Sequence, residues 1–111
     1  MQISSIETIT ELSQLNGRVY VYLPSDELAE QFMRQAETEG FTYGDGAKPT
    51  DRDPATVIAV NTNLTINYVG FIGMIAFGSG AVSVGGKSLI RVRYVDNGEK
   101  NQFASVEHGS E

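Results

Sequence analysis

The stretch from Pro54 through Val95 contains no Asp or Glu, and its only charged residues are Lys87, Arg91 and Arg93. The first 54 residues carry ten acidic against four basic residues, which accounts for the whole net charge of −6. The acid-free stretch is apolar and punctuated by glycines, a composition typical of β-strands joined by tight turns. The sequence therefore predicts an acidic segment beside an apolar, slightly basic sheet, a division that favours a binding protein over an enzyme.

Composition limits the class of protein further. A chain of 111 residues with 41% hydrophobic and 20% charged residues predicts one folded domain, 1–111. The absence of cysteine excludes disulfides and thiolate metal sites. No signal peptide is expected, because the N-terminus has neither a basic region nor a continuous apolar region. No membrane segment is expected, because the longest apolar stretch, 69–81, is short and broken by glycines. The lack of cysteine also fits a cytoplasmic protein, and the pI near 4.6 argues against direct nucleic-acid binding.

Two helices are predicted in the first half. The Ser4-x-x-Glu7 spacing of a capping box and the recurring apolar residues after it predict a short N-terminal helix over about 5–15. The strict alternation of 18–23 predicts a strand with one buried face. Ser25 then caps a second helix over about 26–39, with a stripe of Leu28, Phe32 and Ala36.

The second half predicts mostly strands. Asn97-Gly98 favours a final hairpin, with Val92 opposite Phe103 and Leu89 opposite Val106, and a frayed tail from about 107. The expected loops cover 44–54 and the glycine-rich 78–86. The expected strands cover 41–43, 56–60, 65–69, 71–77 and 89–95.

This element order predicts an α+β fold with a five- to six-stranded, mostly antiparallel sheet and the 26–39 helix on one face. A helix of that length is about 21 Å long and cannot cover both faces of such a sheet. Either the N-terminal helix or a second subunit then covers the other face, and we expect a homo-oligomer.

The segment Ala81-x-x-x-x-Gly86-Lys87-Ser88 resembles a relaxed phosphate-binding loop. Such a loop needs a helix after the lysine, whereas Leu89 onward predicts a strand. We therefore favour a glycine hairpin ending in a surface lysine. A glycine-rich loop beside Lys87 that holds a phosphate without hydrolysing it stays open as an alternative.

Two predicted strands each carry a pair of candidate ligand-binding residues on one strand face. Arg91 and Arg93 are two residues apart and could clamp a phosphate or carboxylate, or could instead be solvent-facing or inter-subunit pairs. Tyr20 and Tyr22 could stack on a base, or could be ordinary cross-strand aromatic residues. With Lys87, these four residues form the candidate ligand-binding set.

The acidic residues form the candidate partner-binding set, which comprises Glu30, Glu37, Glu39, Asp45, Asp51 and Asp53. The three aspartates could bind calcium, but their spacing is not that of an EF-hand and a solvated loop is favoured. The only histidine, His108, cannot complete a catalytic triad or a two-histidine metal site. We therefore expect no enzyme activity, no metal and no cofactor.

The layout from Arg18 onward has a known parallel. The strand Val19-Tyr20-Val21-Tyr22 leads to the helix start 25–32, then to the segment 39–46 and a hairpin around 66–70. Over residues 18–80 this pattern resembles small uncharacterised proteins encoded by bacteriophages and other mobile elements. The resemblance implies an accessory protein in the cytoplasm of a bacterial host cell that acts on host machinery, including defence systems.

The leading hypothesis is a non-enzymatic binding protein that inhibits or modulates a host protein, in an anti-defence role similar to that of anti-CRISPR proteins. Its acidic surface would dock on a basic surface of that partner. A second hypothesis is an oligomeric sponge that sequesters a nucleotide second messenger through the candidate ligand-binding set. A third is a structural accessory protein without a ligand.

Overall fold

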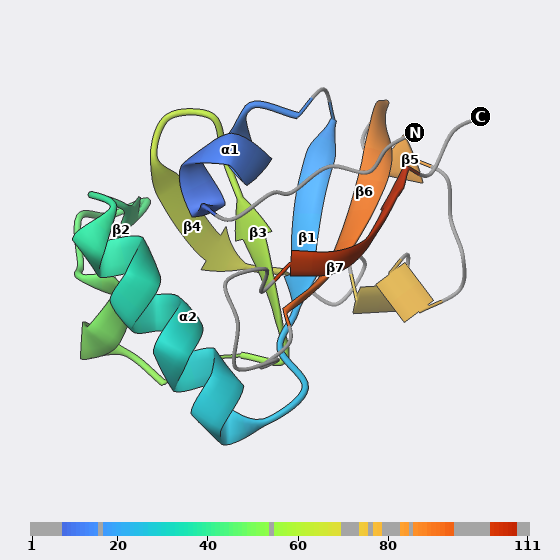
Figure 1. Ribbon diagram of the computed structural model, residues 1–111. Coiled ribbons are helices and arrows are strands. Elements are labelled where there is room, and N and C mark those ends of the chain that lie inside the picture. Colours follow the sequence, from blue (N-terminus) through green and yellow to red (C-terminus); the bar gives the residue numbers. More distant parts are fainter. Residues whose placement is uncertain are drawn as a thin grey trace.

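The computed structural model describes residues 8–15, 17–53, 55–69, 74–75, 77–78, 83–84, 86–94 and 103–108. Their strands form one sheet in the order β2-β4-β3-β1-β6-β5, with β7 also paired to β6 (Figure 1). Only β1 with β6 and β2 with β4 run parallel, and the other four pairings are antiparallel. This arrangement confirms the predicted α+β class and the mostly antiparallel sheet.

Strand β1 (Arg18–Tyr22) lies at the centre of the sheet between β3 (Val57–Val60) and β6 (Lys87–Tyr94). Its register sets Val19 beside Val60 on one side and Ile90 on the other. All three residues are buried in the larger core cluster. The predicted alternation of β1 therefore places its valines in the core and Tyr20 and Tyr22 on the opposite face.

Helix α2 (Asp26–Thr38) confirms the predicted second helix. The Ser25 hydroxyl accepts a hydrogen bond from the Leu28 amide, and Gly40 follows the helix with a φ of +92°, which only glycine adopts readily. Phe32 is fully buried and meets Tyr94 of β6 edge-on, with ring centroids 5.3 Å apart. The apolar stripe thus fastens α2 to one face of the sheet.

Helix α1 (Ile9–Ser13) is shorter than predicted and uses a different cap. Thr8 and Glu11 form the capping box, so the predicted start near residue 5 is wrong, and residues 1–7 lie outside the described part. Ile9 and Leu12 are fully buried in the same cluster as α2. Both helices therefore cover one face, as Figure 1 shows, and α1 does not cover the other.

The opposite face carries a smaller cluster of four buried residues, Tyr20, Val57, Ala59 and Leu89, against which Phe77 packs. Residues 74, 75, 77 and 78 are helical, so the predicted strand over 71–77 is wrong. Tertiary packing can override β propensity, and here the helical Phe77 packs against the smaller cluster. The chain itself covers part of this face, and oligomerisation stays a prediction.

Strand β6 begins directly at Lys87 and pairs with β5 (Ser83–Val84), with Val84 opposite Lys87. Only residues 85 and 86 separate the two strands, and Gly86 has a φ of +84°. Since a strand and not a helix follows Lys87, the geometry of a phosphate-binding loop is absent from the described residues, and the favoured reading of a hairpin that ends in a surface lysine holds. The predicted loop over 78–86 is wrong in its extent, because residues 83 and 84 form β5 and residue 78 is helical.

Strand β7 (Phe103–His108) pairs antiparallel with β6, as the predicted final hairpin requires. The predicted register is wrong: Phe103 lies opposite Tyr94 and not Val92, and a register shift follows between Arg91 and Arg93. The strand continues to His108, past the predicted start of the frayed tail. Asn97-Gly98 and residues 109–111 lie outside the described part.

The edge and loop elements complete the sheet. β2 (Thr42–Tyr43) pairs with β4 (Thr65–Tyr68), and the predicted loop after β2 contains a 3₁₀ turn at Pro49–Asp51. Among the described helices, none combines the length and apolar character needed to cross a membrane.

Candidate functional site

A groove of about 520 Å³ lies between α2 and the 3₁₀ turn Pro49–Asp51. Its lining brings together four of the six predicted partner-binding carboxylates, from two segments separated in the sequence. We call this the acidic groove; it is lined by Glu30, Met33, Arg34, Glu37, Thr50, Asp51, Arg52 and Asp53. Four carboxylates face two guanidinium groups there, so the groove has a net negative charge.

Hydrogen bonds hold the loop side of the acidic groove against the fold. The Thr50 hydroxyl donates to the Glu37 carboxylate at 2.6 Å, and this bond lowers the pKa of Glu37. The Tyr68 hydroxyl donates to the Asp53 carbonyl oxygen at 2.8 Å. The loop is therefore tied to both α2 and β4, which makes the groove a preorganised surface.

Asp45 lies outside the acidic groove and stabilises the loop after β2. Its carboxylate pairs with the Arg52 guanidinium at 2.6 Å, and that contact lowers the pKa of Asp45. Arg52 also lies over the Tyr43 ring, 4.8 Å from its centroid. Among the described residues no group of three or more metal-ligating side chains is placed to hold a metal ion.

The remaining acidic residues divide into engaged and unengaged groups. Glu30 pairs with Arg34 one turn along α2 at 3.8 Å, with both side chains largely exposed. Glu39 accepts hydrogen bonds from the Ile9 and Thr10 amides at 3.1 and 2.7 Å, so it caps α1. The carboxylates of Asp51 and Asp53 have no side-chain hydrogen bond or ion pair within the described part of the chain, so they alone of the six are unengaged there.

The five residues of the candidate ligand-binding set share the face opposite the helices. The parallel register places Tyr20 beside Arg91 and Tyr22 beside Arg93, and Lys87 starts the same strand. The structure therefore brings together residues from two strands that are far apart in the sequence.

Phe77 divides this face into two ends. At the covered end, the Arg91 Nε donates to the Phe77 carbonyl oxygen at 3.0 Å, and the Tyr22 and Phe77 ring centroids are 6.3 Å apart. Arg93 lies over the Tyr22 ring at 5.4 Å. Tyr22, Arg91 and Arg93 thus take part in packing within the chain, whereas Tyr20 and Lys87 lie at the other, open end.

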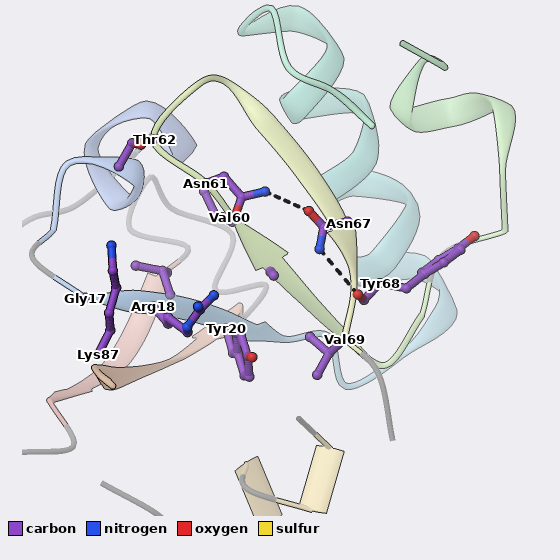
Figure 2. Close-up of a pocket in the computed structure, with 12 residues that line it drawn as sticks. Gly17, Arg18, Tyr20, Val60, Asn61, Thr62, Asn67, Tyr68, Val69 and Lys87 are labelled. Atoms are coloured by element: carbon purple, nitrogen blue, oxygen red, sulfur yellow. Dashed lines mark hydrogen bonds between the residues drawn. The ribbon is translucent and has the colours of Figure 1, made fainter. Parts of the chain in front are cut away.

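The open end forms a depression of about 290 Å³, which we call the sheet depression. Figure 2 shows Lys87 and Arg18 toward one side of it and Asn67, Tyr68 and Val69 toward the other. Sequence reasoning missed Arg18, Asn61 and Asn67 as site residues. The alternation of β1 put Arg18 on the face of Tyr20, but no pattern revealed that the turn after β3 reaches the same place.

Comparisons with known proteins identified no relative of this chain. No protein-family model matches the chain, and neither a curated protein nor a solved structure matches it. The resemblance to phage-encoded proteins therefore rests on the sequence pattern of residues 18–80, and function is inferred from the residues of this chain.

Proposed function

We propose that this protein is a non-enzymatic binding protein that docks on a basic surface of a host protein through the acidic groove, and so inhibits or modulates that partner. The observation that carries the proposal is the convergence of Glu30, Glu37, Asp51 and Asp53 on one groove. Asp51 and Asp53 have no side-chain partner among the described residues and are exposed, so their charges are available to an incoming cation.

The physical basis is electrostatic complementarity. Like charges gathered on one surface attract a basic partner over about 10 Å at ordinary salt and raise the association rate. Arg34 and Arg52 are already paired within the chain, with Glu30 and Asp45, so the unengaged carboxylates of Asp51 and Asp53 are the ones left to meet basic groups of the partner. Because hydrogen bonds already order the loop, little conformational entropy is lost on docking.

The proposed partner is a protein of the bacterial cytoplasm whose basic surface ordinarily holds nucleic acid, as in a nuclease of a defence system. An acidic protein competes for such a surface by presenting carboxylates where phosphates would lie. The resemblance of residues 18–80 to phage and mobile-element proteins supports this anti-defence role.

The test compares two variants with the same change in net charge. Asp51→Lys with Asp53→Lys reverses the unengaged carboxylates of the groove, and Asp26→Lys with Glu27→Lys reverses two exposed carboxylates at the start of α2, outside it. Each is expressed with a tag in bacteria that encode defence systems, and the purified complexes are weighed by native mass spectrometry. Circular dichroism confirms that each variant is folded.

We expect the wild type and the Asp26/Glu27 variant to retain one basic host protein that the Asp51/Asp53 variant loses. Retention by all three proteins, or loss from both variants alike, would show that the groove is not the docking surface. A result in which no host protein is retained by the wild type would refute the proposed function.

A further inference from the structure

An exposed tyrosine lies at the Asp53 end of the acidic groove. Tyr68 of β4 is 46% exposed, whereas the other described tyrosines are buried or half-buried. Figure 2 shows its side chain directed away from the sheet depression, and its hydroxyl donates to the Asp53 carbonyl oxygen at 2.8 Å. The Tyr68 ring is therefore a surface group placed beside an unengaged carboxylate of the groove.

The Tyr68 ring has room for a cation. Two other tyrosines already carry an arginine of this chain, since Arg52 lies 4.8 Å from the Tyr43 ring centroid and Arg93 lies 5.4 Å from that of Tyr22. No cation of the described residues lies over Tyr68, whose ring contact there is Tyr43, with centroids 5.5 Å apart. Because the face of an aromatic ring attracts cations, the exposed part of Tyr68 is a surface on which a partner's cation can lie.

A buried hydroxyl beside Tyr68 lacks a hydrogen-bond partner. Tyr43 is 2% exposed, and its hydroxyl completes no hydrogen bond within the described part of the chain. Burial and the neighbouring Tyr68 hydroxyl raise the pKa of Tyr43, and the charge of Asp53 adds to the rise. The hydroxyl is therefore neutral and lies near the same end of the groove. Since buried polar groups are nearly always paired, this end of the groove lacks a donor that a binding partner can supply.

The charges around Tyr68 favour a guanidinium as that partner group. Asp51 and Asp53 are unengaged within the described part, and the charge of Arg52 is balanced by Asp45 at 2.6 Å. An incoming cation therefore meets net negative charge. A guanidinium is planar, stacks on an aromatic ring and presents five N–H donors at its edge, whereas a lysine ammonium is a compact point charge. A ring, a carboxylate and an unpaired hydroxyl together suit arginine better than lysine.

We propose that Tyr68 and Asp53 form an anchor for one arginine side chain of the basic partner. The guanidinium stacks on the exposed face of the Tyr68 ring, and its N–H groups donate to the Asp53 carboxylate. A further N–H donates to the Tyr43 hydroxyl once the Tyr68 ring shifts to admit it. This inference rests on the proposed docking function and narrows it, because the site then selects arginine and not positive charge alone.

The test is an NMR titration of the ¹⁵N-labelled full chain with two short peptides that carry arginine or lysine at the same positions. Tyr68→Leu removes the exposed ring, and Tyr22→Leu is the matched control, because it makes the same change on the opposite sheet face. The lysine peptide reports the charge and shape of the groove, so a loop disturbed by Tyr68→Leu would weaken both peptides. Asp51→Lys with Asp53→Lys tests the proposed function itself, and the amide spectrum of each variant shows whether it is folded.

We expect both peptides to shift amides 50–53 of the wild type, with the arginine peptide bound about fivefold more tightly. Tyr68→Leu should abolish this preference without changing the affinity for the lysine peptide, and Tyr22→Leu should keep the preference.

The arginine anchor alone is overturned if the wild type binds both peptides equally, or if Tyr68→Leu keeps the preference or weakens both peptides alike. A failure of the proposed function looks different. Neither peptide would then shift amides 50–53, or both would still bind after Asp51 and Asp53 are reversed, and the anchor would be overturned with it.

Discussion

The two faces of the sheet differ in what they bury and in what they leave exposed. Among the described residues, the helix-covered face buries a cluster of eighteen residues, while the opposite face buries four. The opposite face instead presents four of the basic residues, Arg18, Lys87, Arg91 and Arg93, whereas the acidic groove lies on the helix side. The two faces are therefore separated in burial and in charge: the helix-covered side holds most of the core and carries the acidic groove, and the opposite face holds the smaller cluster and carries the basic residues.

The largest expected effect contrasts the two faces directly. Phe32→Ala removes a fully buried ring that contacts Tyr94, and should lower the free energy of unfolding by about 3–5 kcal/mol. Tyr22→Ala, on the opposite face, removes a half-buried ring and should cost much less. Urea unfolding of both variants measures the difference, and equal losses would contradict the separation of the faces.

A second prediction concerns the tight approach of β1 to β6 at the edge of the sheet depression. Gly17→Ala would place a methyl group 2.6 Å from the Ser88 carbonyl oxygen, so the strands must move apart. We expect a loss of about 1–3 kcal/mol in the free energy of unfolding. Gly44→Ala is the control, because no atom lies within 4 Å of a Cβ at that position. If Gly17→Ala is as stable as the wild type, the close approach of Gly17 to Ser88 does not constrain the edge of the sheet depression.

A third prediction separates two acidic residues of the helix side. Glu39→Ala removes the carboxylate that caps α1 and should lower the free energy of unfolding by about 0.5–2 kcal/mol. Glu30→Ala removes one partner of a largely exposed pair and should leave thermal stability nearly unchanged. Thermal melts compare the stability of the two variants. A larger loss of stability in Glu30→Ala than in Glu39→Ala would show that Glu39 does not stabilise α1 as we infer.

The smallest effect is a pH dependence in the charged loop. The pKa of Asp45 is held below its usual value of 3.8, chiefly by its hydrogen bond with Arg52. Since the folded pKa is the lower one, the pair stabilises the fold above the usual value, and the contribution disappears as the pH falls through the folded pKa. Asp45→Asn should therefore melt slightly below the wild type near neutral pH, and the difference should shrink as the pH falls below the usual value and through the folded pKa. A constant difference would exclude ionisation of Asp45 as its cause.

Local patterns predicted the elements that depend on local chemistry. Helix α2 follows from the Ser25 cap and the apolar stripe, and β1 follows from its alternation. The same period of two paired Tyr20 with Tyr22 on one face of β1, and Arg91 with Arg93 on one face of β6. The parallel register that sets these two pairs side by side was not predicted.

Features that depend on packing between distant segments were not predictable. Residues 71–77 have the composition of a strand, and only the tertiary fold reveals that Phe77 packs over Tyr22. The β6–β7 register already departs from the prediction where Tyr94 lies opposite Phe103, and a shift between Arg91 and Arg93 changes it again farther from the turn. The Asn97-Gly98 dipeptide predicted neither offset. The acidic groove likewise required the contact between Thr50 and Glu37, which joins a loop to a helix.

The most direct test of the account is an NMR titration of the ¹⁵N-labelled wild-type protein with a short arginine-rich peptide, which stands in for the basic surface of a partner. We predict shifted amides around Glu30, Glu37 and 50–53, and unchanged amides around Arg18 and Lys87 on the opposite face. Shifts centred on the opposite face, or shifts spread over the whole surface, would contradict docking through the acidic groove.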